Sequence, residues 1–256
     1  MNNKRNIGIV VMSRMESSRL PGKALKKIGN YYSLELCLLN CKKIKKIKNV
    51  ILATTNLKKD KILVRKFNKK YNIFKGESKN VLKRILDVCK QYDFKDVVRV
   101  TGDCPFISPE IIELLIKNHK KEKSDITMIK KSAAGTYGEV YKVEALREII
   151  ANIKNTDYSE YLPYYFINNK ERFSMKKVNL PPSLLRNYRI TLDYKKDLLM
   201  LNELVNKSGK KAKDLTTKNI FKILDQNPNI VKINSRLKLK YMNKDFQKKI
   251  KNFTKF

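Results

Sequence analysis

Continuous apolar runs alternate with more polar stretches along the first half of the chain. Ile7–Met12, Val50–Thr54 and Asp96–Thr101 are rich in Ile, Val and Leu and lack the strict apolar–polar alternation of a half-exposed strand. Such runs are typical of strands that are buried on both faces. We therefore predict three buried strands at these positions.

Helical patterns fill the segments between these strands. In residues 78–91 the apolar side chains recur at the spacing that places them on one face of a helix. Ser108, Pro109 and Glu110 open a further helix, because they supply a capping hydroxyl, a proline at the first position and an acid near the positive end of the helix dipole. Helices are also predicted at about 33–43 and 60–70. This alternation predicts an α/β fold with a mostly parallel central sheet and helices on both faces.

The second half of the chain is less regular. We expect a short strand at Gly138–Tyr141, a strand at Arg189–Asp193 that ends in a carboxylate and is followed by a helix, and helices near 144–152 and at the tyrosine-rich 158–168. The last 30 or so residues are rich in Lys and predict a helix or a loosely held tail. A main domain over residues 1–234 and a basic C-terminal tail over 235–256 are therefore expected.

The charge of the chain is strongly positive. Its 58 Lys and Arg against 24 Asp and Glu give a formal net charge of +34 in 256 residues, which favours contact with polyanions. The lysines are spread in short clusters, however, and this is typical of a solvated basic surface without a dedicated nucleic-acid site. No apolar stretch approaches the roughly 18 residues of a membrane span, and the apolar run at Ile7–Met12 is too short for a signal peptide. A cytoplasmic protein without a membrane partner is expected.

Cysteine and histidine exclude several kinds of site. Cys37, Cys41, Cys89 and Cys104 form no CxxC pair, and His119 is the single histidine of the chain. These numbers argue against a histidine-based metal centre or a Ser-His-Asp triad. Free thiols in a reducing compartment are the simplest interpretation.

The loop after the first predicted strand concentrates phosphate-binding chemistry. Residues 13–23 hold two Arg, one Lys, three Ser and a Pro-Gly turn. Cationic side chains neutralise phosphate oxygens, hydroxyl and backbone N–H groups donate to them, and glycine lets the main chain approach. A Walker A loop is absent. A triphosphate site is one interpretation, and an ordinary basic surface loop with a turn is the other.

Two carboxylates follow predicted strands. Asp103 lies beside Gly102 after the strand at Asp96–Thr101, and Asp193 ends the strand expected at Arg189–Asp193. Ligands of open parallel sheets bind at the carboxyl ends of the strands, and Mg²⁺ prefers oxygen ligands together with substrate phosphates. The two acids are therefore candidates for one Mg²⁺ site. Alternatively, Asp103 caps a turn and Asp193, or Asp197 in its place, caps a helix.

Several motifs together resemble a known family. The segment Ser17–Lys23 (SSRLPGK) is similar to a signature of the cytidylyltransferase superfamily, which includes the 3-deoxy-manno-octulosonate and acylneuraminate cytidylyltransferases. The resemblance is strongest to the spore coat polysaccharide biosynthesis F-type branch and extends in family order over about residues 7–234. It continues through Ala53–Thr55 with Asp60, Gly76 with Val81–Arg84, Arg99–Pro105, Gly138–Val140 and Arg189–Asp193.

This resemblance implies a Rossmann-like nucleotidyltransferase fold with a small substrate or dimerisation subregion, CTP and a sugar as substrates, Mg²⁺, and a homodimer. It implies that Lys23, Arg19 and Asp103 are catalytic and that Asp103 and Asp193 bind the metal. It further implies that Glu139, Glu160, Tyr161 and Arg189 bind the sugar. The implied nucleotide-binding residues are Arg14, Ser17, Ser18, Arg19, Gly22, Lys23, Thr54, Thr55, Arg84, Thr101 and Gly102.

The chain departs from the family pattern at three places. Glu16 stands where the family usually has a small residue, so a carboxylate lies in the phosphate loop. Tyr161 stands where this branch usually has His, and the segment Ile129–Tyr137 is short. The tyrosine-rich segment Tyr158–Phe166 is a candidate dimer surface, the alternative being that its tyrosines belong to the core.

The activity that we expect is transfer of CMP from CTP to a sugar, in particular a 2-keto sugar acid, with release of pyrophosphate for cell-surface polysaccharide or glycoconjugate synthesis. One alternative keeps the fold and changes the nucleotide or the acceptor to a sugar or alcohol phosphate. Another is a basic nucleic-acid-binding protein with a degenerate transferase fold, which requires aromatic platforms along a basic face. A catalytically inactive relative, for which Glu16 is the hint, is the third.

Overall fold

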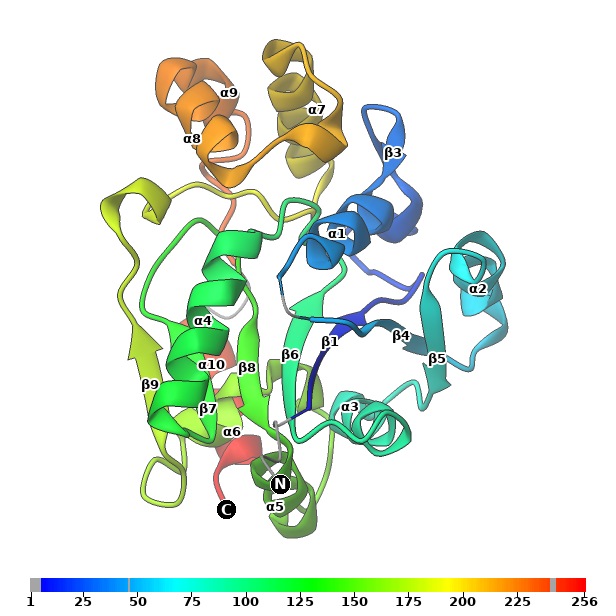
Figure 1. Cartoon of the computed structure of the whole chain (residues 1–256), viewed down its shortest axis with the longest axis vertical. Helices are drawn as coiled ribbons and strands as arrows, with labels where there is room; N and C mark the ends of the chain where they lie inside the picture. Colours follow the sequence, from blue (N-terminus) through cyan, green and yellow to red (C-terminus); the bar gives the residue numbers. More distant parts are fainter. Residues whose placement is uncertain (1–5, 46, 240–242) are drawn as a thin grey trace.

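A seven-stranded sheet forms the centre of the computed structural model, which describes residues 6–45, 47–239 and 243–256. The strand order is β5-β4-β1-β6-β8-β7-β9 (Figure 1). β8 is antiparallel to β6 and β7, and the other pairs are parallel, so the predicted mostly parallel sheet is confirmed. The strands are β1 (Ile7–Met12), β4 (Val50–Thr55), β5 (Asn72–Gly76), β6 (Asp96–Thr101), β7 (Ile126–Ile129), β8 (Glu139–Lys142) and β9 (Met175–Val178).

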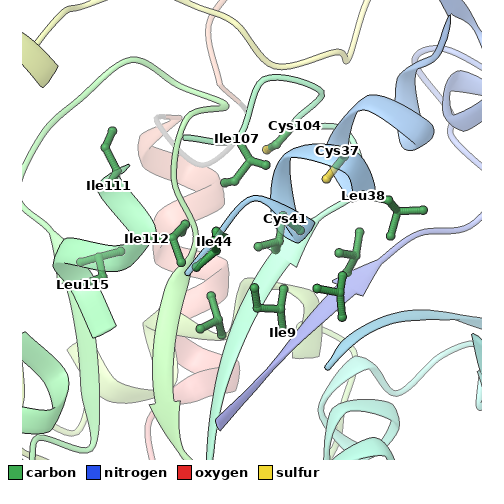
Figure 2. Close-up of a cluster of buried hydrophobic side chains, with 14 of the residues drawn as sticks. Ile9, Cys37, Leu38, Cys41, Ile44, Cys104, Ile107, Ile111, Ile112 and Leu115 are labelled. Atoms are coloured by element: carbon green, nitrogen blue, oxygen red, sulfur yellow. The ribbon is translucent and has the colours of Figure 1, made fainter. Parts of the chain in front are cut away.

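Helices cover both faces of this sheet, which explains the unbroken apolar runs of the central strands. Ile9 and Val11 of β1 pack into a core with α1, α2 and α4, whereas Val10 and Met12 pack into a second core with α3, α5 and α6. Figure 2 shows part of the first core, with Ile9 beneath Cys41 and Ile112. The helices are α1 (Ser33–Lys42), α2 (Lys61–Phe67), α3 (Val81–Gln91), α4 (Pro109–Glu122), α5 (Val143–Asn152) and α6 (Pro163–Ile167).

A third apolar cluster forms a small additional unit. It joins α7 (Lys195–Ser208), α8 (Thr217–Gln226) and α9 (Pro228–Lys232) with the hairpin of β2 (Lys27–Ile28) and β3 (Tyr31–Tyr32). In Figure 1 this unit lies at the end of the molecule toward which β1 and β6 point. Its position at that end agrees with the predicted small subregion beside the main sheet.

The predicted strand at Arg189–Asp193 is wrong. Only a single bridge links Arg189 to Ala134, and the segment otherwise bonds to loops, since Ile190 N donates to Ala134 O (2.7 Å) and Leu192 N to Asp103 O (2.8 Å). Gly135 permits this crossing because its φ is +95° and a Cβ there would lie 2.5 Å from Thr191 N. The segment is extended, yet it crosses the loop after β6 instead of joining the sheet, and this brings Asp193 to the end of β6.

The C-terminal region forms a helix, α10 (Lys244–Thr254), that packs on α6. Within the predicted basic tail 235–256, residues 240–242 lie outside the described residues. The tyrosine-rich segment is divided between a 3₁₀ turn at Ser159–Tyr161 and α6, in which Tyr165 and Phe166 are fully buried. Across the part of the chain that the structure describes, no helix is both long and apolar enough to cross a bilayer.

The four cysteines are free and buried, as expected. The His119 ring is fully buried, where its Nδ1 lies 2.9 Å from the Thr127 hydroxyl and its Nε2 lies 3.4 Å from Asp96. This histidine therefore belongs to a structural polar network under α4.

Candidate active site

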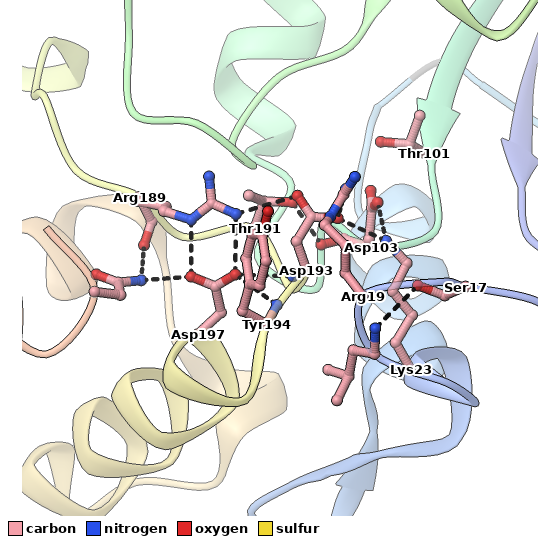
Figure 3. A network of polar contacts seen from close by, with 12 residues as sticks. Ser17, Arg19, Lys23, Thr101, Asp103, Arg189, Thr191, Asp193, Tyr194 and Asp197 are labelled. Carbon is pink, nitrogen blue, oxygen red and sulfur yellow. Dashed lines mark hydrogen bonds and ion pairs between the residues drawn. The ribbon is translucent and has the colours of Figure 1, made fainter. Parts of the chain in front are cut away.

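A cleft of about 490 Å³ opens at the carboxyl ends of β1 and β6. This is the position at which open parallel sheets bind ligands. It collects most of the residues implied by the family resemblance from loops far apart in the sequence, and Figure 3 shows the polar network at its base. The implied residues that line it are Arg14, Ser17, Ser18, Arg19, Lys23, Arg84, Thr101, Gly102, Asp103, Glu139, Glu160, Tyr161 and Asp193.

The loop 13–23 is held in a defined shape by backbone groups and by one buried acid. Ser13 N donates to Ala53 O (3.2 Å), Gly22 N to Met15 O (3.2 Å) and Met15 N to the Asp60 carboxylate (2.7 Å). Asp60 is fully buried and also accepts from the Thr55 hydroxyl. Gly22 has a left-handed φ of +67°, which suits glycine and starts the short turn that carries Lys23.

Lys23 joins two carboxylates at the base of the cleft. Its Nζ lies 2.5 Å from Asp103 Oδ2 and 2.9 Å from Asp193 Oδ1, and Arg19 Nη2 lies 2.6 Å from the same Asp193 oxygen. Burial alone would lower the pKa of Lys23, but Asp103 and Asp193 more than offset this and raise it. Lys23 is therefore charged at neutral pH, and the two acids converge on one cation.

Asp193 is oriented from behind by a second buried ion pair. Arg189 donates to Asp193 Oδ2 (3.1 Å) and to both oxygens of Asp197 (2.8 and 3.0 Å). Asp197 also accepts from the backbone N–H groups of Asp193 (2.9 Å) and Tyr194 (3.0 Å) and from the Asn234 amide (2.9 Å). Arg189 thus contacts a cleft residue without lining the cleft, and Asp197 caps α7 as the sequence allowed.

The cations around Asp193 make the stability of the fold depend on the ionisation of this carboxylate at acidic pH. Burial would raise its pKa, but Lys23 and Arg19 more than offset this and lower the pKa to about 2. A depressed pKa contributes stability that is present at neutral pH and is lost as pH falls toward the folded-state pKa. We expect Asp193→Asn to remove roughly 2 kcal/mol of the acid dependence of the free energy of unfolding below about pH 5. Urea unfolding between about pH 6 and pH 2 measures this, and parallel curves for both proteins would contradict it.

Arg84 brings a buried positive charge to the cleft wall. Its side chain is buried, and its Nε and Nη1 atoms have no hydrogen-bond partner among the described residues. Burial, and then repulsion from Arg14, lowers the pKa of this guanidinium to about 10. A buried cation without a partner is costly, so an anionic or carbonyl oxygen of a ligand is the expected partner.

The opposite part of the cleft combines acids with a buried arginine. Arg99 of β6 faces Glu139 of β8 in the sheet register, and its guanidinium lies 3.2 Å from the Glu139 carboxylate and donates to Glu160 O (2.8 Å). Burial raises the pKa of Glu139, an effect that Arg99 reduces without cancelling. Glu160 extends toward Arg14, with 3.8 Å between their charged atoms, so this wall offers polar groups of both signs.

Some implied site residues do not line the cleft. Thr54 and Thr55 are buried at the end of β4, behind the loop 13–23, where Thr55 fixes Asp60. Gly22 shapes the loop, and Arg189 orients Asp193. Glu16, the carboxylate that departs from the family pattern, lines the cleft but pairs with Lys59 at 2.8 Å, which lowers the pKa of Glu16.

The sequence analysis assigned no site role to several other residues that line the cleft. Arg99 lies inside an otherwise apolar strand. A charged residue at such a position could itself have indicated a site residue. Tyr137 and Leu239 arrive from distant loops and carry no local motif. Cys104 was expected as a free thiol and stood in the motif Arg99–Pro105 without a site role, and it lies in the wall beside Asp103.

The donor set fits a divalent cation only together with a substrate. Among residues 6–45, 47–239 and 243–256, no three acidic, histidine or cysteine side chains converge on a point that could hold a metal. Asp103 and Asp193 do converge on one cation, the Lys23 ammonium. Mg²⁺ usually binds one or two carboxylates and completes its shell with water and substrate phosphate oxygens, so this pair is compatible with that mode.

Comparison with known proteins gives a consistent picture. A family model described as cytidylyltransferase matches residues 8–247. An uncharacterized protein of Methanocaldococcus jannaschii is 34% identical over 236 residues, which cover 90% of this chain and 95% of that protein. The spore coat polysaccharide biosynthesis protein SpsF of Bacillus subtilis is 28% identical over 230 residues (87% and 95%). The structure of a cytidylyltransferase from Leptospira borgpetersenii superposes with a TM-score of 0.81 at 24% identity and covers 91% of this chain and 98% of that one.

Proposed function

The chain belongs to the cytidylyltransferase family, and we propose that its cleft transfers CMP from CTP to a hydroxyl of a 2-keto sugar acid and releases pyrophosphate. Membership makes the protein a CTP-dependent nucleotidyltransferase of the branch that contains the spore coat protein, with a sugar-like acceptor. The proposal adds the class of acceptor and a role in cell-surface polysaccharide or glycoconjugate synthesis. The observation that carries it is the convergence of Lys23, Arg19, Asp103 and Asp193 in one cleft.

The cationic side of the cleft suits the triphosphate. Arg14, Arg19 and Lys23 would contact its phosphate oxygens, with the Ser17 and Ser18 hydroxyls along the same loop. Arg84, whose Nε and Nη1 atoms have no hydrogen-bond partner in the described part of the chain, would donate to an oxygen of the base or ribose. Arg19 and Lys23 would exchange part of their contact with Asp193 and Asp103 for the phosphates when CTP binds.

Catalysis in this arrangement rests on position and charge. The acceptor hydroxyl oxygen bonds to the α-phosphorus, the hydroxyl proton passes to water, and the bond between the α-phosphorus and the pyrophosphate oxygen breaks. Lys23 and Arg19 stabilise the charge that builds on the departing pyrophosphate, and Glu139, Glu160 and Tyr161 orient the acceptor. A divalent cation, which we propose to be Mg²⁺, would be held by Asp103 and Asp193 and would neutralise phosphate charge.

Pyrophosphate release tests this proposal directly. CTP, UTP, GTP and ATP are offered separately with Mg²⁺ and a panel of eight- and nine-carbon 2-keto sugar acids. We expect release with CTP and a sugar acid and none with the acceptor omitted. Release only with neutral sugars or with sugar phosphates would overturn the acceptor class. Salt-sensitive RNA binding without any release would favour the nucleic-acid alternative.

Lys23→Ala is expected to weaken both binding and chemistry. The ammonium contacts both carboxylates, so its loss removes a phosphate contact and leaves Asp103 and Asp193 without the cation that they share. We expect the KM for CTP to rise and kcat to fall by about 100-fold in the pyrophosphate assay. Lys58→Ala, in the neighbouring 3₁₀ turn outside the cleft lining, is the control. Unchanged CTP kinetics in Lys23→Ala would exclude the loop as the phosphate site.

We also propose that the enzyme works as a homodimer, as the family resemblance implied. The candidate surface at Tyr158–Phe166 is partly covered in this chain by its own α10, since the Phe246 and Phe253 rings pack against Tyr158 in tilted arrangements. A dimer would therefore use a surface other than the buried faces of Tyr165 and Phe166. Light scattering after size exclusion gives the oligomeric state.

A further inference from the structure

The C-terminal helix α10 packs against the back of one cleft wall. Glu160 and Tyr161, in the 3₁₀ turn before α6, line the cleft. The ring of Phe246, which is not one of the cleft-lining side chains, meets the Tyr161 ring edge-on, with 5.0 Å between centroids and 71° between planes. Phe253, two turns later on α10, packs on Tyr158 at 4.7 Å. The helix thus supports a surface whose front faces the substrate.

The C-terminal end of α10 is fixed in place. Asn168 Nδ2 donates to Thr254 Oγ1 (2.6 Å), Asn169 Nδ2 donates to Thr254 O (2.7 Å), and Phe256 N donates to Asn169 Oδ1 (2.9 Å). Asn169, Ile250 and Thr254 have no exposed surface. Chain ends usually fray unless such contacts hold them, so this helix is a built part of the fold (Figure 1).

The turn that carries Tyr161 is attached to α3 and β6 by hydrogen bonds and to α10 by aromatic packing. Ser159 Oγ accepts from Val81 N (3.0 Å), which ties the start of the turn to α3, and Arg99 donates to Glu160 O (2.8 Å). The Tyr161 ring packs against Phe246 at 5.0 Å and Tyr158 at 6.3 Å between centroids, and its hydroxyl is hydrogen-bonded to the Glu160 side chain. Deleting the Phe246 ring would leave a space behind Tyr161 into which it can rotate.

We propose that Phe246 is a positioning residue for acceptor selection, because its ring holds the Glu160–Tyr161 wall against the cleft. This inference rests on the proposed function. It extends that function to the C-terminal helix, most of which lies beyond residue 247, where the family match ends. Phe246 packs on Tyr161 of the acceptor wall, whereas the phosphate-binding side chains come from loop 13–23 and from Arg84 of α3, so we expect the effect to fall on the acceptor.

Steady-state kinetics separates this role from a structural one. With CTP and the sugar acid that supports pyrophosphate release, we expect Phe246→Ala to raise the KM for the acceptor by about five- to tenfold and to leave the KM for CTP within about twofold. Phe246→Leu should restore most of the acceptor KM. Phe253→Ala removes an aromatic ring of the same helix that packs on Tyr158, and it should change neither constant. Equal changes in both constants, or the same acceptor effect in Phe253→Ala, would overturn the proposal.

Fluorine NMR of the protein without substrates tests whether Phe246 positions Tyr161, and it does not depend on the identity of the acceptor. In 3-fluorotyrosine-labelled protein, the Tyr161 signal is identified by its loss in Tyr161→Phe. We expect this signal to shift and broaden in Phe246→Ala and to stay in place in Phe253→Ala. An unchanged Tyr161 signal in Phe246→Ala overturns the positioning role. A shifted signal together with turnover of no sugar acid supports the positioning contact and places the failure in the proposed acceptor class.

Discussion

Asp103→Asn is expected to abolish most CMP transfer while leaving the protein folded. Asparagine keeps the size of the side chain but loses the negative charge that Lys23 contacts at 2.5 Å and that a divalent cation would require. We expect kcat for pyrophosphate release to fall by about 1,000-fold, equivalent to about 4 kcal/mol. The fold should persist, because Leu192 and Thr191 bond to the backbone oxygen of Asp103 and not to its carboxylate.

The control for this variant is an aspartate outside the cleft. Asp87→Asn removes a carboxylate that pairs with Lys83 on the surface of α3, and it should change neither kcat nor the melting temperature measurably. Circular dichroism and thermal melting confirm the fold of both variants. Near-normal turnover in folded Asp103→Asn protein would contradict the assignment of Asp103 as a catalytic residue.

The central strands were predictable because burial on both faces requires uninterrupted apolar sequence. The runs at β1, β4 and β6 therefore coincide with the strands to within one residue. The strands that sequence analysis missed lie toward or at the sheet edges, and they are short. β5 (NIFKG) and β9 (MKKV) carry lysines and are only partly buried, so hydrogen bonding to one neighbour defines them more than their apolar content does.

The site was predictable where chemistry follows a strand end. The acids at positions 103 and 193 were expected to meet, and the structure brings both to Lys23. The reasoning that placed Asp193 there was partly wrong, because its segment crosses the loop after β6 without forming a strand. Predicting the pairing of Arg99 with Glu139 would have required the antiparallel register of β6 and β8. Predicting Leu239 in the cleft would have required the path of the C-terminal chain. Neither has a local sequence signal.

Asp197→Ala is expected to be among the most destabilising single changes in the protein. Asp197 is fully buried and accepts from Arg189, from Asn234 and from two backbone N–H groups, so alanine leaves the buried Arg189 guanidinium with only Asp193. We expect a loss of about 3–5 kcal/mol in the free energy of unfolding. Activity should fall as well, because Arg189 and the backbone of Asp193 both depend on Asp197 for their position.

Two control proteins show whether the loss of stability in Asp197→Ala comes from a stranded buried charge or from the loss of any ion pair. Asp225 pairs with Arg186 on the surface at 2.9 Å, and Asp225→Ala should cost at most about 1 kcal/mol. In the double variant Arg189→Met with Asp197→Leu no charge is left stranded, so it should be more stable than Asp197→Ala. Urea unfolding measures all three proteins. Equal losses for Asp197→Ala and Asp225→Ala, or a double variant no more stable than Asp197→Ala, would show that the stranded Arg189 charge is not what Asp197 compensates.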